Sequence, residues 1–62
     1  MIGRMYYFIC DTFSGGTRRI SRWAPSLQWA MNDIKRDPEF NEDDDLIHDS
    51  LRECAKPRRK GA

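Results

Sequence analysis

Long hydrophobic runs are missing from this chain of 62 residues. The longest apolar segment, Met5–Cys10, is far shorter than the ~18 residues that a membrane-spanning helix needs. It is also too short for the apolar core of a signal peptide, and no cleavage-site pattern follows it. Residue 2 is isoleucine, so the glycine that N-myristoylation requires after the first methionine is absent. We therefore expect an intracellular, cytoplasmic protein that makes no membrane contact.

Cysteine and histidine are also scarce. The sequence holds two cysteines, Cys10 and Cys54, and one histidine, His48. Two cysteines make no disulfide framework, and in a reducing compartment we expect two thiols, although a bridge would stabilise so small a chain. Zinc sites need closely spaced ligands such as a C-x2-C pair, which these residues do not supply. We expect no metal, no cofactor and no enzyme activity, because one histidine and two cysteines on apolar faces make a poor nucleophilic arrangement.

Calcium-binding and phosphate-binding loops are not found either. Counted from Asp37, a calcium loop needs glycine at its sixth place and glutamate at its twelfth, but these places hold Glu42 and His48. The glycine-rich stretch 14–17 lacks the lysine and the following helix of a phosphate loop. The acidic run from Asp37 to Asp49 indicates either carboxylates at a helix N-terminus or an acidic face that recognises a basic partner.

Charge is present in blocks, which the formal net charge of +1 conceals. Residues 1–31 carry a net +3, residues 32–55 a net −6 and residues 56–62 a net +4. Such blocks govern association and its salt dependence more than the fold. We expect one small domain over residues 1–56 and a disordered basic tail over residues 57–62. A core of this size supplies only about 3–5 kcal/mol, so a homodimer or a constitutive partner would compensate for it.

The first half of the chain predicts a β-hairpin. Arg4–Cys10 is rich in aromatic and β-favouring residues on both parities, which is typical of a strand covered on both faces or at the edge of a dimer sheet. Gly15-Gly16 indicates a two-residue turn, because both central residues of a type I′ turn have positive φ. This turn would place Phe8 opposite Trp23 and Ile9 beside Arg22, with arginines packed against aromatic rings.

The second half predicts two helices. Pro25 suits a first helical turn, Ser26 and Ala24 compete as the N-cap, and the apolar residues that follow have helical spacing. Asp37-Pro38 ends this helix, and a second one begins near Asn41 with the aspartates in its first turn. The apolar stripes of the two helices are formed by Leu27, Ala30, Met31 and Ile34, and by Ile47, Leu51 and Cys54. The expected fold is α+β, with a β-hairpin followed by two short helices packed on one face of a small antiparallel sheet (ββαα).

The two tryptophans are expected to differ. Trp23 directly precedes the first helix, so we expect it to fill the corner between sheet and helix. Trp29 projects about 200° from Leu27, which places it on the polar side of the helix. It is therefore either buried by the second helix or available as an anchor for another protein chain.

These features favour a small non-enzymatic protein-binding inhibitor or regulator. Its acidic helix would meet a basic surface of a host protein, with a tryptophan as anchor. The residues assigned to partner binding are Trp29, Arg36, Asp43, Asp44, Asp45 and Asp49. In size and style the chain resembles the small accessory proteins of phages and mobile elements, and this resemblance implies an anti-defence, anti-CRISPR-like role against a nucleic-acid-handling protein.

The alternative is a small regulator that binds nucleic acid directly. A basic hairpin followed by a helix suits a groove or a phosphate backbone, and the C-terminal arginines would add phosphate contacts. The residues assigned to this role are Arg18, Arg19, Arg22, Arg58, Arg59 and Lys60.

Overall fold

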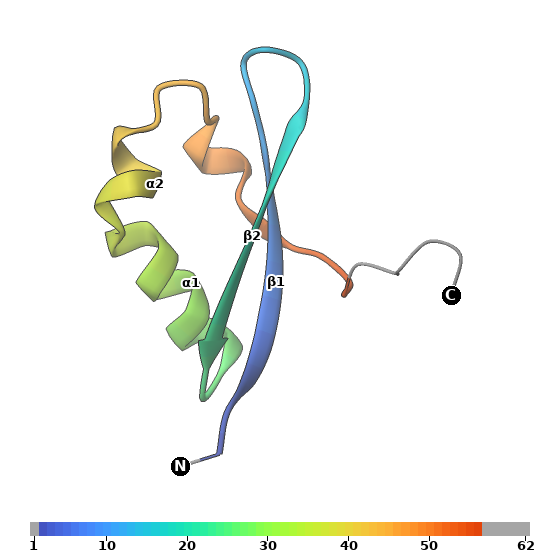
Figure 1. Ribbon diagram of the computed structural model, residues 1–62, viewed down its shortest axis with the longest axis vertical. Helices are drawn as coiled ribbons and strands as arrows, with labels where there is room; N and C mark the ends of the chain where they lie inside the picture. The colour runs from blue at the N-terminus through green and yellow to red at the C-terminus, as the bar shows by residue number, and fades with distance from the viewer. Residues whose placement is uncertain (1, 57–62) are drawn as a thin grey trace.

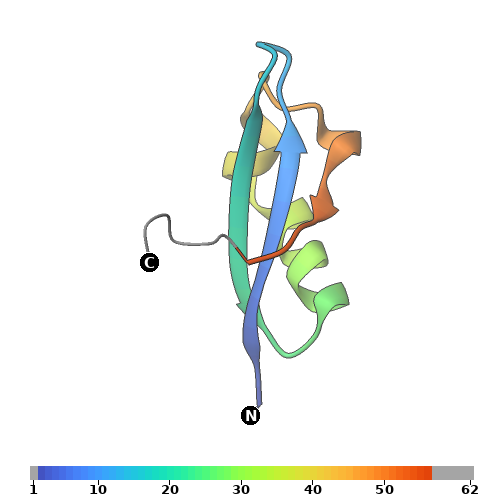
Figure 2. The ribbon, with the colours of Figure 1, turned by 90° about the vertical axis from the view of Figure 1, so that its right-hand side faces the viewer.

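Two long antiparallel strands form the centre of the fold in this computed structural model, which describes residues 2–56. A short third strand pairs with the other side of the first, giving the sheet order β2-β1-β3. The elements are β1 (Arg4–Asp11), β2 (Thr17–Ala24), α1 (Leu27–Arg36), α2 (Pro38–Glu42), the 3-10 helix η1 (His48–Ser50) and β3 (Arg52–Glu53). The helices all lie on one face of the sheet (Figures 1 and 2), so the predicted α+β fold with a hairpin followed by helices is confirmed.

The turn of the hairpin is longer than the sequence predicted. It spans residues 12–16, and Gly15 alone has a positive φ, of 98°. Thr12 organises the turn, because its amide donates to the Gly16 carbonyl at 2.9 Å and its hydroxyl accepts from the Gly16 amide at 3.0 Å. Asp45 holds the same turn from outside, since its carbonyl accepts from the Phe13 amide at 2.7 Å.

This longer turn makes the predicted register wrong. Phe8 lies opposite Ile20, not Trp23, and Trp23 lies opposite Met5. The shift is by an odd number of residues, and such a shift exchanges the two faces of a strand. Ile20 therefore packs against the core, while Trp23 is on the face away from the helices and is 67% exposed. The expectation that Trp23 fills the corner between sheet and helix is wrong for this reason.

Helix α1 matches its prediction closely. Ser26 is the N-cap, and its hydroxyl accepts from the Trp29 amide at 3.3 Å. The helix ends at Arg36, directly before Asp37-Pro38, and its buried residues are Ala30 and Ile34. Leu27 is a correction: as the first residue of the helix it is 38% exposed and does not belong to the buried core.

The second helix begins earlier than predicted and is shorter. Helix α2 starts at Pro38, and the Asp37 carboxylate caps it by accepting from the Glu39 amide at 3.0 Å. The aspartates that were expected in its first turn come after it, where Asp43 accepts from the Asp45 amide at 3.0 Å and forms a turn. Residues 47–54 consequently form η1 and β3, and the predicted stripe of Ile47, Leu51 and Cys54 is not helical.

The core lies between the sheet and the helices. Its buried residues are Phe8, Cys10, Ala24, Ala30, Ile34, Phe40 and Leu46, and Tyr6, Ile20, Met31 and Leu51 pack against them. Both cysteines are free thiols, and the Cys10 thiol donates to the Ile47 carbonyl at 3.2 Å. Of the residues in the two predicted apolar stripes, Ile34 is fully buried, Leu51 and Ile47 are half-buried and Leu27 is exposed.

Candidate interaction surfaces

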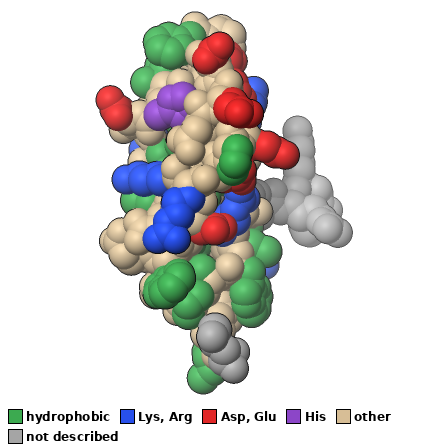
Figure 3. Space-filling model, turned by 90° about the vertical axis from the view of Figure 1, so that its left-hand side faces the viewer, with side chains coloured by type: hydrophobic (Ala, Val, Ile, Leu, Met, Phe, Trp, Pro, Cys, Tyr) green, Lys and Arg blue, Asp and Glu red, His purple; other side chains and the backbone are tan. Residues whose placement is uncertain are grey.

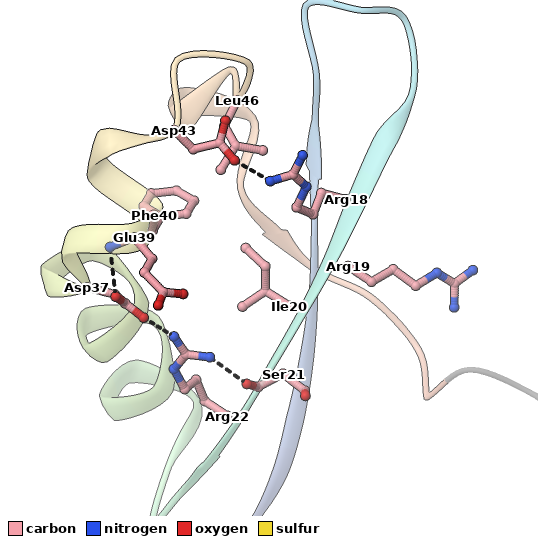
Figure 4. Close-up of a pocket in the computed structure, with 10 residues that line it drawn as sticks. All are labelled: Arg18, Arg19, Ile20, Ser21, Arg22, Asp37, Glu39, Phe40, Asp43 and Leu46. Carbon is pink, nitrogen blue, oxygen red and sulfur yellow. Dashed lines mark hydrogen bonds and ion pairs between the residues drawn. The ribbon is translucent and has the colours of Figure 1, made fainter.

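A cleft separates β2 from α2 and shows how the charge blocks meet (Figure 4). Its volume is about 290 Å³, and Ile20, Phe40 and Leu46 form its apolar part. Arg18 forms an ion pair with Asp43 across one end of the cleft. Arg22 crosses the other end, where it pairs with Asp37 and places its Nε 3.2 Å from the Asp33 carboxylate.

These ion pairs join residues that the sequence assigned to different functions. Asp43 was assigned to partner binding, and Arg18 and Arg22 were assigned to nucleic-acid binding. The side chains of Asp43 and Arg22 are 24% and 29% exposed, and that of Arg18 is 49% exposed. Solvent therefore screens the pairs, and each contributes only modestly to stability. Their main effect is on position, because they fix the helices against the edge of the sheet.

The other acidic residues of the predicted partner site divide into two kinds. Asp45 is half-buried and accepts from the Ser14 amide at 3.1 Å and from the Ser14 hydroxyl at 3.0 Å, so it holds the hairpin turn. Asp44 and Asp49 are exposed, and neither forms an ion pair within residues 2–56. Only the second kind has carboxylates available to another molecule.

Trp29 lies on the outer side of α1. Its side chain is 63% exposed, so neither α2 nor η1 covers it. Arg36, at the end of the same helix, is also exposed. We call residues 27–50 the helical layer; Figure 3 faces it and shows most carboxylates in the upper half, Lys and Arg side chains across the middle and hydrophobic side chains at both ends. Of the two environments that the sequence allowed for Trp29, the one between the helices is not formed.

The opposite face of the sheet carries no helix (Figure 2). We call it the open face; the strand register assigns to it Met5, Tyr7 and Ile9 from β1, Arg19, Ser21 and Trp23 from β2, and Arg52 from β3. Tyr7 lies between two hollows of about 150 Å³ and 280 Å³, and both reach Cys54. Sequence reasoning missed this surface, although the apolar residues on both parities of β1 were its signal.

The nucleic-acid-binding residues predicted from the sequence do not share one surface. Arg19 points away from the helices and belongs to the open face, whereas Arg18 and Arg22 point toward them (Figure 4). Arg58, Arg59 and Lys60 lie outside the described residues. The hairpin therefore presents one arginine, not three, on its open side.

Known proteins give no guide to this arrangement. Comparisons with protein-family models, with curated proteins and with solved structures found no match to the chain. Function has to be argued from the surfaces themselves.

The remaining candidate residues have structural roles. The His48 Nε2 is 2.7 Å from the Phe40 carbonyl, and the two rings meet edge to face with centroids 4.8 Å apart. His48 therefore joins η1 to α2. Within residues 2–56 no three His, Cys, Asp or Glu side chains group as metal ligands, and no helix is long and apolar enough to cross a membrane.

Proposed function

We propose that this protein is a non-enzymatic regulator that binds another protein through its helical layer. The observation that carries the proposal is the position of Trp29, a large apolar ring that is 63% exposed on a helix of only ten residues. Tryptophan is enriched among the residues that dominate binding energy at protein interfaces, and it loses much unfavourable hydration when a partner covers it. Nothing in the fold requires this ring, because α1 packs through its opposite side.

The charge around this surface favours a basic partner. Asp44, Asp49 and Glu42 are exposed on the helical layer, and none of them is neutralised by the hairpin arginines. Carboxylates on the same layer as an apolar anchor speed encounter with a positively charged surface. Basic surfaces are characteristic of proteins that handle nucleic acid. We therefore propose an inhibitor of such a host protein, of the anti-defence kind that the resemblance to accessory proteins of phages and mobile elements implies.

The test is a capture experiment with tagged protein from a nuclease-treated lysate of the source cell. We expect a protein that is retained by the unmodified chain and by Gln28→Ala, but is lost with Trp29→Ala. Gln28 is the matched control, since it is exposed on the adjacent position of the same helix. The captured protein is then purified and titrated against the same three chains. Equal affinity of all three would overturn the proposal.

A further inference from the structure

The open face presents two aromatic side chains, Trp23 and Tyr7. Trp23 is 67% exposed, and its indole lies against Gly3, where an added Cβ would be 2.8 Å from the indole Nε1. The absence of a side chain at Gly3 is therefore what lets the ring lie along the strand. Tyr7, half-buried, separates the two hollows on the same face. Flat rings on a rigid sheet are suited to stacking against planar groups.

The charge of this face is positive. Arg19 is exposed and points away from the helices (Figure 4), and Lys56 lines the larger hollow. The strands β1 and β2 contain one carboxylate, Asp11, and Arg52 pairs with it at 3.2 Å. Most carboxylates of the chain belong to the helical layer, on the other side.

Each hollow combines an aromatic wall with a cation and polar groups. The smaller one is lined by Tyr7, Arg19, Ser21 and Cys54, without a carboxylate, and the larger one by Tyr7, Arg4, Met5 and Lys56, with one carboxylate, Glu53. The smaller hollow therefore offers a ring to stack on, a guanidinium and a hydroxyl within one recess. This combination matches a nucleotide, which has a planar base and an anionic phosphate.

We infer that the open face binds single-stranded nucleic acid, a role separate from the protein-binding function of the helical layer. Bases stack on Trp23 and Tyr7, while Arg19 and Lys56 contact phosphates. A duplex is excluded as the preferred ligand because its bases are already stacked and their faces cannot reach these rings. A second copy of the chain is a poorer occupant, since it would bring Arg19 and Lys56 close to like charges with only Glu53 and the paired Asp11 to offset them.

The binding test uses the full chain and fluorescein-labelled oligonucleotides of thymidine and uridine, with a duplex of equal length as reference. We expect fluorescence anisotropy to report binding of the single strands at low salt and at least tenfold weaker binding of the duplex. The logarithm of the association constant should fall with the logarithm of salt by about 0.7 for each phosphate contacted.

Stacking is followed through the two indoles separately. With Trp29→Phe, Trp23 is the sole indole, and we expect its fluorescence to be quenched by the single strand. With Trp23→Phe, Trp29 is the sole indole, and we expect no quenching, because it lies on the other side of the molecule. Quenching of Trp29 but not Trp23 would place the ligand on the helical layer and overturn the inference.

Affinity changes in matched variants locate the site. Trp23→Ala should weaken binding about tenfold, which is what loss of one base–aromatic stack produces. Arg19→Glu should weaken it similarly, whereas Lys35→Glu, the same charge change on exposed α1, should change it less than twofold. The inference fails if no single strand binds at low salt, or if the two charge reversals have equal effects. It also fails if sedimentation shows a dimer that Trp23→Ala abolishes, because the face would then serve a second copy.

Discussion

The two tryptophans are the residues whose environments differ most from expectation. Both are exposed, and they lie on opposite layers: Trp23 on the open face and Trp29 on the helical layer. Neither indole is part of the core, which is built around Phe8, Phe40 and Ile34. The exposed rings are therefore better explained by binding than by folding.

Truncation of Trp29 distinguishes a role in binding from a role in folding. Trp29→Ala should leave the free energy of unfolding nearly unchanged, because the side chain is mostly in solvent, while it weakens a protein complex by about 2 kcal/mol or more. Thermal melts and a titration against the captured partner measure the two effects. Trp23→Ala serves as the control and should also melt normally. A large drop in the melting temperature for Trp29→Ala would contradict its assignment as an anchor.

Two residues of the same helical stripe should respond differently to truncation. Ile34 is fully buried, so Ile34→Ala should cost about 2–5 kcal/mol, comparable to the whole stability of so small a domain. Leu27→Ala should cost clearly less, since part of that side chain is already in water. Urea unfolding of the two variants tests this difference. Similar losses would mean that the start of α1 is packed more tightly than the structure shows.

At the level of elements, the sequence predicted what depends on neighbours along the chain. Helix α1 was predicted with its cap at Ser26 or Ala24, of which Ser26 is the N-cap, and with its end before Pro38, because capping, apolar spacing and the residue before proline act within a few positions. The length of the hairpin turn was not predicted correctly, because Asp45 fixes the turn from 31 residues away. Because the turn was predicted too short, the predicted strand register was wrong, and so was the face assigned to Trp23.

The start of the second helix was predicted wrongly because aspartate favours more than one local structure. Asp43, Asp44 and Asp45 are favourable at a helix N-terminus, and the prediction used them so. The same side chains also form turns by accepting from backbone amides two residues ahead, as Asp43 does from Asp45. Asp37, which precedes a proline, took the cap instead. The candidate sites shifted accordingly: Asp44 and Asp49 stay available, while Asp43 and Asp45 serve the fold.

Removal of the Asp45 carboxylate should loosen the hairpin turn. Asp45→Ala deletes two hydrogen bonds to Ser14, both partly in solvent, so we expect a loss of about 1 kcal/mol and faster amide exchange in residues 13–16. Asp44→Ala is the matched control and should alter neither quantity. Unchanged exchange at Ser14 in the Asp45 variant would show that the backbone bond from Phe13 suffices to hold the turn.

Over the whole molecule, charge blocks that are separate in sequence are partly neutralised by folding. The basic hairpin meets the acidic middle block across the β2–α2 cleft, through Arg18–Asp43 and Arg22–Asp37. What remains is divided unevenly between two layers: exposed carboxylates outnumber Lys35 and Arg36 on the helical layer, and Arg19 and Lys56 lie on the open face. The two layers of the molecule therefore differ in their charge.

This division predicts how association responds to charge. Neutralising Asp44 and Asp49 together by asparagine should slow association with a basic partner and flatten its salt dependence, with no loss of stability. Asp43→Asn should instead lower stability slightly, because it breaks the pair with Arg18. Stopped-flow association at several salt concentrations, with thermal melts alongside, distinguishes the two variants. If the association rate at low salt is the same with and without the Asp44 and Asp49 substitutions, the acidic run serves turn formation alone.

The position of β3 has a consequence for the order in which the molecule folds. Strand β1 gains its second neighbour only when the Cys54 amide reaches Tyr7 and the Ser50 hydroxyl reaches the Asp11 amide, a contact that spans 39 residues. Closing a loop of that length is slower than closing the hairpin, so β1 and β2 should pair first. Until residues 51–54 dock, β1 keeps a bare edge of the kind that pairs with other chains. In pulse-labelled hydrogen exchange, the hairpin amides should therefore become protected before the Cys54 amide. The extent of aggregation during refolding should report how long the edge of β1 stays unpaired.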